Sequence, residues 1–247
     1  MSNPSTFFCR TGSKKPIREI IKRNAPKDYS TYVEPFVGSG AILHYLYDPE
    51  KKGVINDIDK DLMSGYKLLK KGVSGDIERF DKMSLSSMNA FVDKPASSDL
   101  DRLAKRLMVS CLTFGTKGSG KLFKETNIYP KLKNLDKYKE FYKNVSMLSQ
   151  DYKSVIRQYD SPTTFFYIDP PYEGSEEQRV YKAGAFNNEE LAKVLKGIKG
   201  KFLLSMNDSP KVREDFKGFK IRGLTVRTQG KKGIGVKPRK EVLIKNY

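Results

Sequence analysis

The feature that most limits the fold of this chain is a set of short apolar runs, each of which stops at residues that turn the backbone. The first run, YVEPFV, ends at Gly38-Ser39-Gly40 and is followed by the helical spacing of AILHYLY. The second ends at Asp57, before the helical pattern DLMSGYKLLKKG, and the third, FFYI, stops at Asp169. Strands that alternate with helices predict a mainly parallel sheet with helices on both faces, because parallel neighbours need a crossover connection. We therefore expect an α/β protein.

Further strands and helices fall in two separate parts of the chain. A loop with Gly12 precedes the helical pattern IREIIKRN, and the helical pattern NNEELAKVLKGI leads into an apolar run, KFLLSMND. The segments LTVRTQ and EVLIKNY are typical of a terminal strand pair. Between residues 73 and 160 the sequence shows polar helical stretches and a Gly-rich basic run, TFGTKGSGKLFKETN, but no strong strand. We expect residues 1–72 and 161–247 to form one core, and residues 73–160 to be a mostly helical insertion.

The charge of the chain indicates a polyanionic partner. The sequence has 47 Lys and Arg against 29 Asp and Glu, a net charge of +18, which is far more than solubility requires. Such a field attracts nucleic acid through the release of counterions from the phosphates. On charge alone, a solvated Lys-rich surface is an equally good explanation.

Cysteine and histidine are too scarce for several kinds of site. Cys9 and Cys111 are too few for a disulfide framework and match no zinc-binding pattern, which is typical of a reducing compartment. His44 is the only histidine, so zinc deaminase sites, HExxH hydrolases and histidine-based triads are excluded. We expect no metal in the site.

The sequence shows no sign of a membrane segment. No apolar run approaches the roughly 20 residues that span a bilayer. The amino-terminal MSNPSTFF also lacks the charged and apolar regions of a signal peptide. We expect a soluble, unsecreted protein in the cytoplasm, associated with the nucleoid or encoded by a virus.

The turn at Gly38-Ser39-Gly40 and the acid that ends the next strand predict a nucleoside site. Glycines at the carboxyl end of a strand let the backbone approach a ligand closely, and Asp57 can accept hydrogen bonds from ribose hydroxyls there. A dinucleotide fingerprint needs a third glycine where this chain has Leu43, so NAD and FAD are disfavoured. The glycines can also serve packing alone, and an acid can simply cap the following helix; for Asp61 we prefer that role.

Asp169-Pro170-Pro171-Tyr172 is the most specific pattern in the chain. Two prolines after a strand-end acid lock the backbone and leave no N–H groups to compete for acceptors. Asp169 and the Pro170 carbonyl can accept both hydrogens of an aromatic amine and align its nitrogen for attack on a sulfonium methyl. Tyr172 can stack on a base that has left the duplex. The alternative is a rigid turn with the tyrosine in the core.

The order YVEPFVGSG, INDID and FFYIDPPY resembles the DNA adenine methylase (Dam) family. The resemblance covers residues 7–72 and residues 162–247, whereas residues 73–160 carry no matching motif. It implies a Rossmann-like methyltransferase core, S-adenosylmethionine as cofactor, and methyl transfer to the N6 amine of adenine in specific sites of double-stranded DNA. It also implies that residues 73–160 recognise the target.

The resemblance further implies which residues contact each ligand. Arg10 stands where the family usually has an aromatic residue, but a guanidinium plane can also stack on the cofactor. The cofactor-binding candidates are Arg10, Gly12, Lys14, Phe36, Gly38, Asp57 and Asp169. The DNA-binding candidates are Lys117, Lys121, Lys124 and Asn127 in the insertion and Arg227, Lys231 and Lys232 in the tail, each of which can equally be solvated surface.

Three alternatives stay open at this point. The same chemistry can act on cytosine N4 or on RNA, because the amine is equally poor as a nucleophile. A catalytically silent DNA-binding protein can retain the fold, because a fold does not secure a function. A dehydrogenase comes third. A restriction endonuclease partner is possible, but no motif identifies one.

Overall fold

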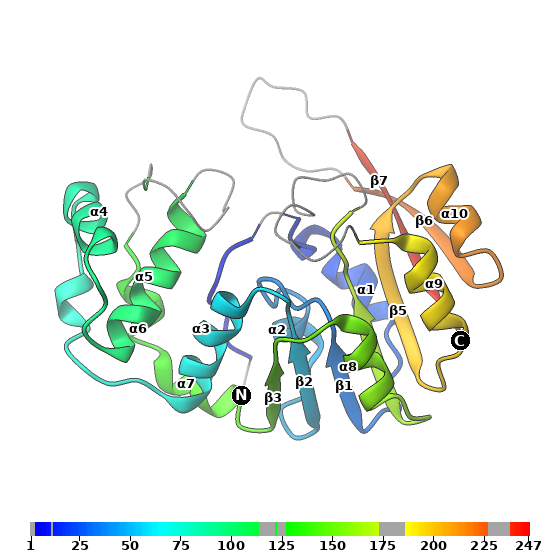
Figure 1. Ribbon diagram of the computed structural model, residues 1–247, viewed down its shortest axis with the longest axis horizontal. Helices are drawn as coiled ribbons and strands as arrows, with labels where there is room; N and C mark the ends of the chain where they lie inside the picture. The colour runs from blue at the N-terminus through cyan, green and yellow to red at the C-terminus, as the bar shows by residue number, and fades with distance from the viewer. Residues whose placement is uncertain (1–2, 11, 114–121, 123–126, 173–185, 227–237) are drawn as a thin grey trace.

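The computed structural model describes residues 3–10, 12–113, 122, 127–172, 186–226 and 238–247 (Figure 1). Within them, seven strands form one sheet in the order β3-β2-β1-β4-β5-β7-β6. The strands are β1 (Thr31–Glu34), β2 (Lys52–Asn56), β3 (Val145–Leu148), β4 (Thr164–Ile168), β5 (Lys201–Asn207), β6 (Lys220–Val226) and β7 (Arg239–Lys245). The first five strands are parallel to one another, and β7 runs antiparallel to both β5 and β6.

Helices cover both faces of this sheet, as Figure 1 shows. One hydrophobic cluster packs α1, α2, α3, α5 and α7 over one face, and a second packs α8, α9 and α10 over the other. The predicted α/β architecture is therefore confirmed. The helices are η1 (Lys15–Ile17), α1 (Arg18–Asn24), α2 (Leu43–Leu46), α3 (Lys60–Lys71), η2 (Glu78–Phe80), α4 (Leu85–Asp93), α5 (Asp99–Leu112), α6 (Tyr129–Leu132), α7 (Leu135–Phe141), α8 (Tyr152–Tyr159), α9 (Asn188–Lys196) and α10 (Pro210–Asp215).

The strand register brings the predicted turns to one edge of the sheet. Val33 of β1 lies opposite Val54 of β2 and Phe166 of β4, so these strands end at nearly the same level. Open α/β sheets bind their ligands at the carboxyl ends of such strands. Because β7 is antiparallel, its first residues lie at this same edge, with Glu241 opposite Asn207 at the end of β5.

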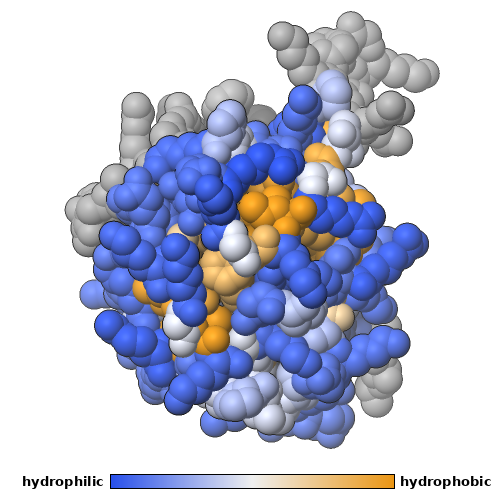
Figure 2. All heavy atoms as spheres, turned by 90° about the vertical axis from the view of Figure 1, so that its right-hand side faces the viewer, coloured by the Kyte–Doolittle hydropathy of each residue, from blue (hydrophilic) through white to orange (hydrophobic). Residues whose placement is uncertain are grey.

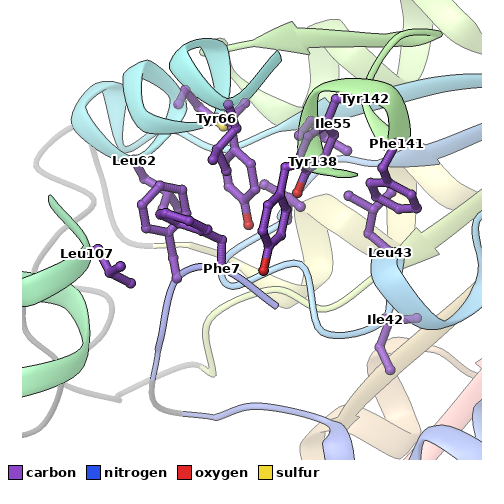
Figure 3. Packing of buried hydrophobic residues seen from close by; sticks show 14 of the residues in the cluster. Phe7, Ile42, Leu43, Ile55, Leu62, Tyr66, Leu107, Tyr138, Phe141 and Tyr142 are labelled. Atoms are coloured by element: carbon purple, nitrogen blue, oxygen red, sulfur yellow. The ribbon is translucent and has the colours of Figure 1, made fainter. Parts of the chain in front are cut away.

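The amino-terminal segment is packed into the core by aromatic side chains. Phe7 and Phe8 are both fully buried. The Phe7 ring meets Tyr138 of α7 edge to face with centroids 5.0 Å apart, and Phe8 meets Tyr66 of α3 in the same way at 5.1 Å. Figure 3 shows Phe7 among side chains of α3 and α7. This packing holds the residues that lead to Lys14 against the helices beside the sheet.

Residues 73–160, in which the sequence shows no strong strand, contain one short edge strand, β3. β3 pairs in parallel with β2, with Val145 opposite Gly53. It is an edge strand with one partner, and only Val145 of its four residues is fully buried, so its sequence, VSML, carries a weak apolar signal. The predicted limits of the insertion stay a prediction, but residues 145–159 belong to the sheet and to the helices that cover it.

The predicted start of α3 is also wrong. Asp59, not Asp61, is the N-cap: its Oδ1 accepts a hydrogen bond from the Leu62 N–H at 3.0 Å. The Asp61 side chain lies in the first turn and is 87% exposed. An acid at either position is favourable near a helix N-terminus, so the sequence pattern alone does not separate them.

Cys9 and Cys111 are joined by a disulfide. The bridge links the amino-terminal segment to the last turn of α5, across a sequence separation of 102 residues. The count of two cysteines predicted no framework and favoured a reducing compartment, and the structure differs because these two residues meet side by side in space.

The face of the molecule seen in Figure 2 is mostly hydrophilic, as the large share of charged residues in the sequence leads one to expect. Figure 2 shows hydrophilic residues over most of the face on which α9, α10 and β6 lie, with a limited apolar area. No helix within the described ranges has the length and apolar character to cross a membrane.

Gly65 of α3 tests the close packing of the amino-terminal segment. A Cβ at this position would lie 2.5 Å from Cζ of the buried Phe8 ring. Alanine is better than glycine by about 1 kcal/mol inside a helix, yet we expect Gly65→Ala to lower the free energy of unfolding by about 1–3 kcal/mol because of the clash. The matched control is Gly197→Ala at the end of α9, where the nearest atom lies 3.9 Å away. Urea unfolding measures the free energy of unfolding of both variants. A Gly65→Ala variant as stable as the wild type contradicts this packing.

His44 gives a pH prediction. Its ring stacks on Phe141 with centroids 4.7 Å apart, its Nε2 lies 2.8 Å from the Tyr142 Oη, and burial lowers the pKa of the imidazole to about 3. An unfolded histidine has a pKa of about 6.5. Between these values only the unfolded chain binds the proton, so His44 makes stability fall as the pH drops from about 6.5 towards 3, by up to about 1.4 kcal/mol per pH unit. Because the chain has one histidine, imidazole NMR signals followed from pH 7 to pH 4 report it directly. A titration midpoint near 6.5 contradicts the prediction.

Candidate active site

The centre of the site is an ion pair between the acid that follows β4 and a lysine from the amino-terminal loop. Lys14 Nζ lies 2.6 Å from Asp169 Oδ1, and the Lys14 side chain is only 4% exposed. Ser205 of β5 donates its hydroxyl to the same Oδ1 at 3.1 Å, and Tyr167 Oη lies 2.9 Å from the serine. Asp169 is therefore held from two sides before any ligand binds.

Lys14 is a permanent cation in this position. Burial lowers the pKa of Lys14, but the Asp169 carboxylate, together with Tyr172 and Glu241, more than offsets this and raises the pKa above its ordinary value. The ammonium lies 5.0 Å from the centre of the Tyr172 ring, a cation–π distance. Burial raises the pKa of Tyr172 to about 12, so the phenol is neutral. Lys14 can therefore position its neighbours but cannot take a proton at neutral pH.

The predicted nucleoside turn lies beside Asp57. Gly38 has φ +49°, a left-handed conformation that favours glycine, and nothing lies within 4 Å of the position that a Cβ would take. Its N–H donates to Asp57 Oδ2 at 3.0 Å, while Asp57 Oδ1 accepts from the Asp59 N–H at 3.0 Å. Asp57 is 3% exposed, and burial raises the pKa of its carboxyl group. Two backbone N–H groups thus hold Asp57 in place, and the space beside Gly38 is open.

Asp59 joins three parts of the chain, and sequence reasoning missed this role. It caps α3, accepts from Arg106 of α5 at 3.1 Å through Oδ1, and forms an ion pair with Arg10 through Oδ2. The motif INDID contains Asp59, but nothing in the sequence identifies Arg106 as its partner. Arg10 therefore pairs with Asp59, two residues after the Asp57 that lies beside the nucleoside turn.

Phe36 and the amino-terminal loop complete the cofactor candidates. Phe36 is 8% exposed, and its ring centre lies 5.1 Å from Tyr152 and 5.9 Å from Phe186, so it belongs to an aromatic wall. Gly12 is exposed with φ +77°, and its carbonyl accepts from Lys14 Nζ at 3.4 Å. The Ser13 hydroxyl between them is buried and has no hydrogen-bond partner among the described residues.

Of the DNA-binding candidates, Asn127 alone lies among the residues that the structure describes. Asn127 is exposed, donates to Asp81 at 2.7 Å and accepts from the Tyr129 N–H at 2.9 Å, so it supports the start of α6. Within the described part of the chain, no group of three acids, cysteines or histidines could hold a metal ion. The candidates that lie outside the described residues are Lys117, Lys121, Lys124, Arg227, Lys231 and Lys232.

The open space at Gly38 and the unpartnered hydroxyl of Ser13 fit a nucleoside with a polar tail, held at the carboxyl edge of a Rossmann-like sheet. Together with the Asp-Pro-Pro-Tyr turn, they define an S-adenosylmethionine-dependent methyltransferase. The family comparison is more specific: the chain belongs to the D12 class N6 adenine-specific DNA methyltransferases, whose family model matches residues 11–228. The predicted family, the reaction at adenine N6 of DNA and the cofactor are confirmed.

The chain is also similar to three curated methyltransferases. Type II methyltransferase M.MjaIII of Methanocaldococcus jannaschii is 29% identical over 67% of this chain and 68% of its own length. Type II methyltransferase M1.LlaDCHI of Lactococcus lactis subsp. cremoris is 25% identical over 99% and 96% of the two chains. Type II methyltransferase M.CviBI of Paramecium bursaria Chlorella virus NC1A is 22% identical over 85% of each.

Two solved structures cover nearly the whole chain, each with a TM-score of 0.45. One is a precorrin 8w decarboxylase from Methanobacterium thermoautotrophicum, 11% identical over 99% of this chain and 98% of that one. The other is precorrin-6y C5,15-methyltransferase from Geobacter metallireducens GS-15, 10% identical over 96% and 94%.

Asp57 provides the test of the nucleoside turn. Asp57→Asn places an NH2 group against the N–H of Gly38 or Asp59, where only an acceptor fits. We expect a loss of about 1–3 kcal/mol in the free energy of unfolding and at least about a tenfold loss in affinity for S-adenosylmethionine. Asp61→Asn makes the same chemical change on a side chain that is 87% exposed, and should leave the affinity unchanged while lowering the free energy of unfolding by less than about 1 kcal/mol. Denaturant unfolding and calorimetric titration measure them, and equal effects of the two substitutions would contradict the assignment.

Proposed function

We propose that this chain methylates adenine N6 at specific sites in double-stranded DNA, after the base has left the helix, and that Asp169, Pro170 and Tyr172 act on that base. The observation that carries the proposal is the position of Asp169. It follows β4 directly, is fixed by Lys14 and Ser205, and lies at the sheet edge shared with Gly38 and Asp57. An acid held in this way is positioned for a substrate before the substrate arrives.

The first step is to make the amine a better nucleophile. The lone pair of adenine N6 is delocalised into the ring, so the amine attacks poorly. In the proposal, the Asp169 carboxylate and the Pro170 carbonyl accept the two amine hydrogens and favour a pyramidal nitrogen. Pro170 and Pro171 have no N–H groups, so no backbone donor competes at the turn.

Methyl transfer then follows as a single displacement. S-adenosylmethionine supplies the methyl group as an electrophilic carbon on a positively charged sulfur. The N6 lone pair forms the new C–N bond, and the electrons of the broken S–C bond stay on sulfur. The proton that N6 then loses goes to the Asp169 carboxylate or to water. Lys14 stays protonated, because its raised pKa leaves it no basic lone pair at neutral pH.

The remaining residues hold the two ligands. In the proposal, Tyr172 stacks on the extruded base, since its half-buried ring already lies against the Lys14 ammonium. The cofactor is held by Arg10, Gly12, Lys14, Phe36, Gly38, Asp57 and Asp169.

DNA contacts complete the proposal. Asn127 and the basic residues of the insertion and tail contact the DNA, which the net charge of +18 attracts. Because DNA is the substrate, we place the activity in the cytoplasm. A flipped base is required because the reacting amine is inaccessible inside the stack.

The test is base analysis of nucleic acid after incubation with S-adenosylmethionine. We expect N6-methyladenine in mixed-sequence duplex DNA, little in the matching single strand, and a loss of at least about 100-fold in rate for Asp169→Ala. Asp28→Ala is the control, because Asp28 is an exposed acid that pairs with Lys201 at the opposite end of β5.

Other results would replace the proposal. N4-methylcytosine as the product, or modification of RNA only, would move the same chemistry to another substrate. DNA binding that persists in wild type and Asp169→Ala, with no modified base from either, would favour a silent DNA-binding protein.

A further inference from the structure

Glu241 is a buried carboxylate that the proposed mechanism leaves unused. It lies on β7, directly opposite Asn207 of β5 and Leu224 of β6, and it is 3% exposed. Because β7 runs against its neighbours, Glu241 lies at the edge of the sheet where the parallel strands end. The carboxylate is therefore at the level of the active site, although it is close to the end of the chain.

Glu241 also points to the same face of the sheet as Asp169. Leu243, two residues further along β7, pairs with Ser205 and belongs to the same hydrophobic cluster as Tyr167 of β4. Side chains two residues apart on a strand share a face, and directly opposed residues do so as well. Glu241 thus shares a face with Ser205, which holds Asp169.

The electrostatics of the site agree with this geometry. Glu241 helps to raise the pKa of Lys14 and of Tyr172. Burial raises the pKa of Glu241 itself, the Lys14 ammonium lowers it, Asp169 raises it and Arg239 lowers it. Lys14 is therefore a buried cation that interacts with two acidic side chains, Asp169 and Glu241.

The Glu241 carboxylate is not needed to satisfy a structural donor. Its Oε2 is buried and has no hydrogen-bond partner among the described residues. A buried acceptor without a partner lowers the stability of the folded chain, because it has lost its hydrogen bonds to water. Such a group fits a site that receives positive charge from a ligand, because the ligand then offsets the cost.

The proposed reaction places positive charge near Asp169 and Glu241 at two stages: on the sulfur of the bound methyl donor, and on the attacking nitrogen during transfer. The methyl donor is a sulfonium cation, whereas its product is a neutral thioether. During transfer the positive charge moves from sulfur to the attacking nitrogen, which is held at Asp169. A second negative charge beside Asp169 stabilises both the bound donor and the transition state, but not the bound product.

We propose that Glu241 is a second acidic residue of the active site, which selects the cationic methyl donor over its neutral product and supports the positive charge that develops on the base amine. The proposal rests on the proposed function, since it needs the amine to be held at Asp169. Glu241 acts through its charge and through Lys14, so it is a positioning residue rather than a group that touches the reacting atoms.

Equilibrium binding of S-adenosylmethionine and S-adenosylhomocysteine to the full chain, by calorimetry at pH 8, tests the inference. We expect Glu241→Gln to weaken binding of the donor by about 3- to 10-fold while the product changes by less than about twofold. Glu241→Asp keeps the charge and should keep most of the wild-type preference. Glu214→Gln removes the same charge from an exposed side chain of α10 and should leave both affinities unchanged.

The outcomes separate this inference from the proposed function. If Glu241→Gln leaves the ratio of the two affinities unchanged, the inference is overturned. This includes an equal loss of affinity for both ligands, which indicates a merely structural role. A loss of the preference in Glu241→Asp also overturns it, provided that thermal melting shows a folded protein. Absence of N6-methyladenine with the wild type instead counts against the proposed function, whatever the binding ratios are.

Discussion

The candidate active site depends on one ion pair, in which the buried ammonium of Lys14 meets the partly exposed carboxylate of Asp169. An ammonium that is almost fully removed from water needs a carboxylate, and breaking such a pair from one side costs about 3–5 kcal/mol. The pair joins the amino-terminal loop to the end of β4, although 155 residues separate its partners. The aromatic packing of Phe7 and Phe8 brings the loop to this place. The packing of the core therefore determines where Lys14 meets Asp169.

The sheet topology explains why residues from both ends of the sequence meet there. Parallel strands deliver their carboxyl ends to one edge, which collects the Gly38 turn, Asp57 and Asp169. The single reversal at β7 delivers the start of a strand to that same edge and adds Glu241. Glu241, the seventh residue from the carboxyl end of the sequence, thus lies at the same sheet edge as Asp169, which pairs with Lys14.

The sheet, its covering helices and the turns at its edge could be predicted because each has a local sequence pattern. The runs that end at Gly38, Asp57 and Asp169 combine a buried strand with a distinctive turn, and such signals need no information from elsewhere in the chain. The sheet, its covering helices and the terminal strand pair were predicted for the same reason.

The failures share a different cause, since each depends on contacts between distant segments. β3 is an edge strand that exists by pairing with β2. Cys9 meets Cys111 only because the amino-terminal segment packs beside α5. Asp59 likewise meets Arg106, and Glu241 interacts electrostatically with Lys14, across separations that no spacing rule connects.

The position of Asp59 limits how the protein can be re-engineered. The same carboxylate binds Arg10 of the amino-terminal segment, caps α3 and binds Arg106 of α5. A chimera that exchanges residues 73–160, the region predicted to recognise the target, for those of a relative also exchanges Arg106, one partner of this acid. Such a graft needs an arginine in the place of Arg106, because without it Asp59 loses one of the two arginines that it joins, and the amino-terminal segment around Arg10 is affected as well.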